Sequence, residues 1–167
     1  MAFEDLIISR AGAFFHGRRF PCVVGRGGVT LDKREGDGAT PIGQHRIVGM
    51  LYRPDRVHPA ALPDWAEPIR IGALWSDDPR DPSYNSQVRI PHNYSHENLR
   101  RPDPLYDLVL ITDWNHLIVR PGAGSAIFIH RWRRPGVPTA GCIGFAAQDL
   151  LWIAARISMG ASVVVRG

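Results

Sequence analysis

Between residues 106 and 113 the chain reads Tyr106-Asp107-Leu108-Val109-Leu110-Ile111-Thr112-Asp113. Successive side chains of a strand point to opposite faces, and here the face of Leu108 and Leu110 is more apolar than the face that carries the two aspartates. Trp114-Asn115-His116 then forms a tight connection, so we expect a hairpin with a second strand over Leu117–Arg120. The stretch therefore predicts antiparallel β-structure.

Short apolar runs between turn residues recur along the whole chain, which is typical of a β-rich domain. The other predicted strands are Asp5–Arg10, Phe20–Gly25, His45–Leu51, Val88–Pro91, Ser125–His130 and Ala161–Arg166. Only Ala146–Ser158 has apolar residues at helical spacing, and Gly160 follows as a stop signal, so we expect one helix there. The long polar segment Tyr52–Arg101 has little periodicity. It predicts either a loop region that walls a cleft or short elements that the pattern does not resolve.

Length and composition fit one domain over residues 1–167, because 167 residues that are 44% hydrophobic can bury a real core. The net charge is +4, and Lys33 is the one lysine among twenty basic residues. Guanidinium groups bind carboxylates and phosphates, so an anionic partner is plausible. The basic residues are scattered among sixteen acids, however, and we expect no nucleic-acid partner. No run is long enough to span a membrane, and the first ten residues show no secretory signal.

A candidate nucleophile lies in Pro138-Thr139-Ala140-Gly141-Cys142-Ile143-Gly144, and His130 stands twelve residues before the cysteine. A nearby histidine can accept the thiol proton, and small residues beside the cysteine leave backbone N–H groups open to an oxyanion. The alternative is a buried structural cysteine with a core histidine. Cys22 lies in a strand-like run and is expected to be a small core side chain. A disulfide between Cys22 and Cys142 is the other possibility in an oxidising compartment, but it would block a nucleophile.

Two segments together resemble the L,D-transpeptidase (YkuD-type) catalytic domain. His130, a loop and Thr139-Ala140-Gly141-Cys142-Ile143 match its histidine and Ser/Thr-x-Gly-Cys-hydrophobic signature, and Gly36-Asp37-Gly38-Ala39-Thr40-Pro41-Ile42-Gly43 matches its upstream Thr-Pro-x-Gly block. The resemblance runs from about Phe20 to the end. It implies a mainly β fold, a β-sandwich with one principal helix after the cysteine and a long cleft-lining loop region. The chain departs from the family pattern at Gly144, where many members have arginine, and at Arg131, where many have glycine.

The resemblance also implies a reaction on the stem peptides of peptidoglycan. Cys142 would attack the stem carbonyl, His130 would act as base and acid, and the N–H groups of Gly141 and Cys142 would hold the oxyanion. An amine acceptor would give 3–3 crosslinks, and water or a free D-amino acid would instead give carboxypeptidase or exchange activity. A non-catalytic cell-wall-binding module is the alternative from another class. The expected substrate-binding residues are Thr139, Arg131, Arg133 and His96.

The spacing of His92 and His96 could suit zinc on a helix, but the polar, proline-flanked segment favours an exposed or substrate-lining pair. We expect no metal and no cofactor. The start of the predicted helix follows Cys142 closely and could lower the thiol pKa slightly. We further expect a monomer, and the resemblance implies a location in the cell envelope or periplasm.

Overall fold

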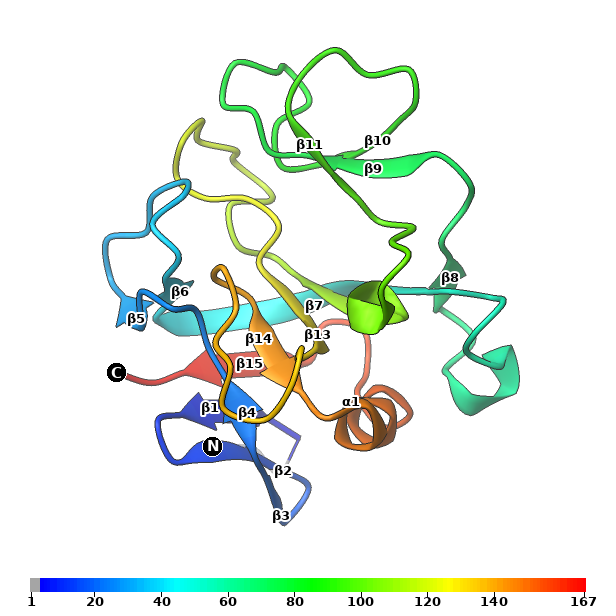
Figure 1. Ribbon diagram of the computed structural model, residues 1–167. Helices are drawn as coiled ribbons and strands as arrows, with labels where there is room; N and C mark the ends of the chain where they lie inside the picture. Colours follow the sequence, from blue (N-terminus) through cyan, green and yellow to red (C-terminus); the bar gives the residue numbers. More distant parts are fainter. Residues whose placement is uncertain (1–3) are drawn as a thin grey trace.

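The computed structural model describes residues 4–167 and is built around a ten-stranded sheet that is nearly closed. Its strands are β1 (Leu6–Ser9), β2 (Gly12–Phe15), β3 (Arg18–Phe20), β4 (Cys22–Val23), β7 (Gly43–Tyr52), β8 (Glu67–Pro68), β12 (Leu108–Thr112), β13 (Phe128–Arg131), β14 (Ile143–Phe145) and β15 (Ser162–Val165). The order is β3-β2-β1-β15-β7-β12-β13-β14-β4, with β8 paired to β7 (Figure 1). The expectation of a mainly β chain is confirmed.

Smaller elements complete the fold. A three-stranded sheet has the order β10-β9-β11, and a two-stranded sheet joins β5 and β6. Their bounds are β5 (Val29–Thr30), β6 (Thr40–Pro41), β9 (Ala73–Ser76), β10 (Gln87–Arg89) and β11 (His96–Asn98). The helices are α1 (Ala147–Ala154) and the 3-10 turns η1 (Pro59–Ala61) and η2 (Pro104–Tyr106). None of the helices within residues 4–167 is long and apolar enough to cross a membrane.

Strand β12 is buried on both faces, because two different layers cover it. Leu108 and Leu110 pack in one apolar cluster with the buried face of α1. Val109 and Ile111 pack in a second cluster with Phe128 of β13 and Trp75 of β9. The three-stranded sheet therefore lies on the opposite side of β7 and β12 from α1 (Figure 1). Trp75 meets Phe128 edge-on, with 4.9 Å between the ring centroids, so an aromatic contact joins the three-stranded sheet to the ten-stranded sheet.

The predicted strand over Leu117–Arg120 is wrong. Leu117 and Ile118 are 90% and 82% exposed and pair with no strand of the described residues. Asn115 accounts for the difference, because its side chain closes the loop: it donates to the carbonyl of Arg120 (2.9 Å) and accepts from the N–H of Arg120 (2.7 Å). The partners of β12 are instead β7 and β13, both antiparallel.

Other predicted elements differ in their bounds. The run Phe20–Gly25 is divided, since β3 ends at Phe20, Pro21 follows, and β4 covers only two residues. The strand expected over Val88–Pro91 is β10, which begins one residue earlier and ends two residues earlier than expected. Helix α1 begins at Ala147, one residue later than expected, and ends at Ala154, four residues before Ser158. The segment Tyr52–Arg101 contains η1 and β8 to β11, so it holds short elements and is no structureless loop.

Candidate active site

Cys142 and His130 line the same pocket, which has a volume of about 750 Å³. The sheet register brings them together. Strands β13 and β14 are parallel neighbours with Ile129 opposite Ile143, so Cys142, just before β14, lies beside Phe128 and shares its buried cluster. His130 follows Phe128 on the same face of β13, because side chains alternate along a strand. The pocket is lined by Arg26, Lys33, Glu35, Gly36, Glu97, Arg101, Leu105, Tyr106, Ser125, Ala126, Ile127, His130, Arg133, Val137, Pro138, Thr139, Ala140 and Cys142.

The turn that carries Cys142 is fixed by Thr139. The Thr139 hydroxyl accepts from the N–H of Gly141 (3.1 Å) and donates to the carbonyl of Cys142 (2.5 Å). The backbone of Thr139 also pairs with the chain after β4, accepting from the N–H of Arg26 (2.8 Å) and donating to the carbonyl of Val24 (3.0 Å). The cysteine is thus presented by a turn that is held on both sides.

The upstream Thr-Pro-x-Gly block is hydrogen-bonded to this turn through Thr40. The fully buried Thr40 hydroxyl donates to the carbonyl of Gly141 (2.7 Å) and accepts from the N–H of Gly25 (2.9 Å). Gly141 has φ +141°, and a Cβ there would lie 3.1 Å from the carbonyl oxygen of Ala39, so only glycine fits between the two segments. The two sequence motifs therefore meet in space through Thr40 and Gly141.

The Cys142 thiol is buried and neutral. Its Sγ donates to the carbonyl of Ala126 at 3.1 Å. Burial raises the pKa of the Cys142 thiol to about 12, and the negative charge of Glu97 acts in the same direction. Ala126 has a left-handed backbone with φ +51°, which sets the direction of its carbonyl. Its N–H donates to the side chain of Asn85 (3.0 Å). Helix α1 packs in the other apolar cluster and begins after β14, so its first turn does not reach the thiol.

His130 is oriented by its own neighbour in the chain. Its Nδ1 lies 2.6 Å from the carbonyl oxygen of Arg131, and a carbonyl only accepts, so Nδ1 carries the proton and Nε2 is the basic nitrogen. Burial lowers the pKa of His130 to about 4, with Arg101 adding to the effect. The Tyr106 ring packs edge-on against the imidazole, with centroids 5.2 Å apart.

Both signs of charge line the pocket. Lys33 Nζ pairs with Asp37 (2.6 Å), and Arg101 pairs with Asp103 (2.7 Å). The side chains of Arg26 and Arg133 are in no ion pair with any residue from 4 to 167. On the acidic side, Glu35 accepts from Tyr84 and Ser125, and Glu97 accepts from Tyr106 at 2.5 Å. The two unpaired arginines are therefore the groups best placed to meet an anionic ligand.

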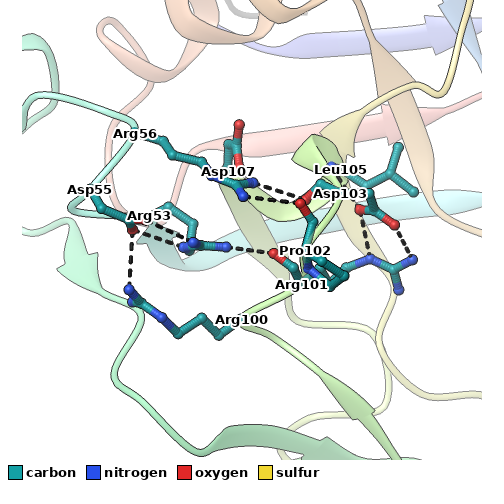
Figure 2. Close-up of polar contacts among 9 residues, drawn as sticks. All are labelled: Arg53, Asp55, Arg56, Arg100, Arg101, Pro102, Asp103, Leu105 and Asp107. Atoms are coloured by element: carbon teal, nitrogen blue, oxygen red, sulfur yellow. Dashed lines mark hydrogen bonds and ion pairs between the residues drawn. The ribbon is translucent and has the colours of Figure 1, made fainter.

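An arginine–aspartate network fixes the segment that delivers Arg101 and Tyr106 to the pocket (Figure 2). Arg53 donates to the carbonyl of Arg101 (2.5 Å), and Arg56 donates to the carbonyls of Pro102 and Asp103 (3.0 and 3.1 Å). Both arginines follow β7, and each also forms an ion pair, Arg53 with Asp55 and Arg56 with Asp107. The segment 101–103 is thus held to the chain that follows β7 by hydrogen bonds from two arginine side chains.

The structure separates the other residues expected at the site. Thr139 and Arg133 line the pocket, whereas Arg131 does not; its carbonyl holds His130. The N–H of Gly141 is engaged by Thr139, and the N–H of Cys142 has no hydrogen-bond acceptor among residues 4–167.

His96 is exposed and lies outside the pocket lining, while its neighbour Glu97 lines it. The sequence analysis did not single out Glu97, although the alternation of β11 places its side chain on the opposite face from that of His96. Gly144 has no room for the family arginine, since a Cβ there would lie 2.8 Å from Val23 Cγ2 and 3.2 Å from Trp132 Cβ.

The two remaining expectations concern His92 and Cys22. His92 Nε2 lies 2.8 Å from Asp81, and its ring centroid is 5.6 Å from that of His96. Within residues 4–167, no three His, Cys, Asp or Glu side chains are grouped to hold a metal ion. Cys22 is half-buried against the apolar cluster that contains α1, and it and Cys142 are both free thiols.

Comparisons with known proteins identify the family and the fold. Residues 12–165 match the L,D-transpeptidase catalytic domain family (YkuD). Among solved structures, the helical cell shape determining protein Pgp2 from Campylobacter jejuni aligns with a TM-score of 0.50 at 13% identity, over 97% of this chain and 46% of its own.

An L,D-transpeptidase from Mycobacterium smegmatis aligns with a TM-score of 0.46 at 14% identity, over 98% and 58% of the two chains. L,D-transpeptidase 3 from Mycobacterium tuberculosis, in complex with a faropenem-derived adduct, aligns with a TM-score of 0.46 at 13% identity, over 98% of this chain and 60% of its own. The chain thus spans between 46% and 60% of the length of these structures. No curated protein matches it.

Proposed function

The chain belongs to the L,D-transpeptidase catalytic domain (YkuD) family, and from this premise we propose that it is a cysteine acyltransferase acting on peptidoglycan stem peptides. Cys142 is the nucleophile and His130 the general base. The observation that carries the proposal is their presence in one pocket, with the thiol on a turn held by Thr40 and Thr139 and the imidazole Nε2 left basic by the Arg131 carbonyl.

The reaction begins with attack of Cys142 Sγ on the carbonyl of the stem. His130 Nε2 takes the thiol proton as the bond forms and then gives it to the departing D-amino acid. The N–H of Cys142 holds the oxyanion, joined by that of Gly141 when Thr139 releases it. An amine of a second stem resolves the thioester and forms a 3–3 crosslink.

The free carboxylate of the stem is bound by arginine. Arg133 is exposed, lines the pocket and lies in no ion pair among the described residues, so it takes the role that Gly144 cannot fill. Arg26 also lines the pocket, near Gly38, and adds a second positive charge.

A carbapenem tests the nucleophile, because a strained cyclic amide acylates an active thiol and the adduct is stable enough to weigh. We expect the intact-mass spectrum of the protein to gain one carbapenem, and peptide mapping to place it on Cys142. Cys142→Ala should abolish the adduct with an unchanged circular dichroism spectrum, and the matched variant Cys22→Ala should keep it, since Cys22 lies outside the pocket. A folded protein that forms no adduct would contradict the proposal.

Product analysis separates transfer from hydrolysis. With a tetrapeptide stem, a transpeptidase gives dimers when an acceptor stem is present, whereas a carboxypeptidase gives only tripeptide and D-alanine. A cell-wall-binding module without catalysis would give neither product, and its binding would survive Cys142→Ala.

A further inference from the structure

Two carboxylates of the pocket, Glu35 and Glu97, have no role in the proposed reaction and form no ion pair within residues 4–167. Glu35 accepts two hydrogen bonds, whereas Glu97 accepts one and is the carboxylate whose charge acts on the Cys142 thiol. Arg101, which lies nearby, directs its guanidinium to Asp103 (2.7 Å) and stacks over the ring of Tyr106 (5.2 Å). None of residues 4–167 forms an ion pair with Glu97. A partly buried carboxylate without a counter-charge is costly, and a cationic ligand would remove that cost.

The carboxylate is also held in place. Tyr106 donates to Oε2 at 2.5 Å, and within the described residues Oε1 accepts no hydrogen bond. Tyr106 packs at the same time against the ring of His130, so one side chain fixes both the carboxylate and the imidazole. Glu97 is on β11 of the three-stranded sheet, opposite Trp75 of β9, whose ring packs on Phe128 beside the turn of Cys142.

We propose that Glu97 binds the ammonium group of the acyl acceptor and removes its proton before attack on the thioester. The inference rests on the proposed function and adds the group that activates the acceptor, whose primary amine is protonated at neutral pH. Glu97 is then the residue that favours transfer over hydrolysis.

The electrostatic surroundings of Glu97 suit this task. The groups that face it are Tyr106, Asp77, Arg101, Glu35 and Cys142. Burial raises the pKa of Glu97, and the nearby Asp77 and Glu35 raise it further, against the lowering effects of the Tyr106 hydrogen bond and of Arg101. A carboxylate with a raised pKa is a stronger base and accepts a proton more readily near neutral pH.

The proposed step balances. The ammonium gives one proton to the Glu97 carboxylate and becomes an amine. Its nitrogen attacks the thioester carbonyl, so a C–N bond forms and the C–S bond breaks. The second proton leaves the nitrogen through His130 Nε2 and returns to the departing Cys142 sulfur. Glu97 then releases its proton to solvent, and both side chains regain their starting forms.

The partition of the acyl-enzyme tests the inference. Wild-type protein and Glu97→Gln are acylated with a tetrapeptide stem, and the ratio of dimer to hydrolysed tripeptide is measured by mass spectrometry at several acceptor concentrations. Glutamine keeps an oxygen for Tyr106 but cannot accept a proton, so we expect the ratio to fall at least about tenfold. Glu67→Gln, on exposed β8 outside the pocket, is the matched control and should leave the ratio unchanged.

Hydroxylamine provides the second arm, because it is uncharged at neutral pH and needs no deprotonation before attack. Transfer to hydroxylamine should be equal in Glu97→Gln and wild type. A variant that loses both transfers equally, or that keeps the wild-type dimer ratio, would overturn the role of Glu97. An absence of any acyl-enzyme in the wild type would instead overturn the proposed function itself.

Discussion

Asn85 should be the most costly single truncation among the side chains that support the pocket. It is buried and makes four hydrogen bonds. Its Oδ1 accepts from the indole of Trp75 (3.1 Å) and from the N–H of Ala126 (3.0 Å), and its Nδ2 donates to two carbonyls of the loop after β12 (3.0 and 2.8 Å). Asn85→Ala leaves the two buried N–H donors unpaired, at about 1–3 kcal/mol each. Because φ is +57° at this position, alanine adds about 1 kcal/mol of strain.

These contributions predict that Asn85→Ala lowers the free energy of unfolding by about 4 kcal/mol, which corresponds to a fall in Tm of roughly 8–16 °C for a chain of this size. Urea titration followed by tryptophan fluorescence measures the loss. Asn98→Ala, at an exposed position of β11, is the matched control and should cost less than about 0.5 kcal/mol. A loss below about 1 kcal/mol in Asn85→Ala would refute the reasoning that the buried N–H groups of Trp75 and Ala126 depend on this side chain.

Three further outcomes are expected. Thr40→Val should destabilise the protein by about 2–4 kcal/mol in urea titration, because the Gly141 carbonyl and a buried N–H both lose their partner; an unchanged midpoint would contradict this. Burial lowers the pKa of His130 from 6.5 to about 4, so the unfolded state binds a proton that the folded state does not. The free energy of unfolding should therefore fall by up to about 3 kcal/mol as the pH drops from 6.5 towards 4, and His130→Gln should flatten that profile; equal slopes would contradict it. Arg133→Gln should raise KM for a stem peptide with a free carboxylate at least about tenfold, whereas Arg134→Gln, outside the pocket, should change it less than twofold; equal effects of the two variants would remove Arg133 from carboxylate binding.

The strands and the candidate pair could be predicted because their signals are local. Alternation along Ser125–His130 places Phe128 and His130 on one face, and the structure confirms that Phe128 and Ile129 lie in different apolar clusters. The hairpin of β2 and β3 was missed although its signal is also local. Its connection is His16-Gly17, two residues with φ of +47° and +75°, the conformation that a two-residue hairpin turn requires.

The pocket wall could not be predicted, because it is fixed by contacts between residues far apart in the sequence. The segment with Arg101 and Tyr106 is held by the side chains of Arg53 and Arg56, which bind backbone carbonyls about 50 positions later in the chain (Figure 2). Glu97 reaches the pocket through the pairing of β11 with β9. Such contacts leave no periodicity for a sequence pattern to reveal. The Thr-Pro-x-Gly block shows the same limit: the resemblance marked Thr40, but only the structure gives its physical role beneath Gly141.

The charge states of Cys142 and His130 indicate how the pair would avoid side reactions. Burial raises the pKa of the thiol and lowers that of the imidazole, so both groups are neutral near pH 7 and the buried site holds no ion pair in its free form. A thiol in this state reacts slowly with reagents that only require a thiolate. In the proposed reaction, the proton would pass to His130 when a carbonyl lies against Sγ, and negative charge would develop on the carbonyl oxygen and not on the sulfur. The imidazolium and the oxyanion would then form together, beside the N–H of Cys142, and the pocket would gain no net charge. Burial would therefore make attack by the thiol depend on a bound acyl donor. An acyltransferase needs this selectivity, because it keeps the nucleophile from reacting with other electrophiles.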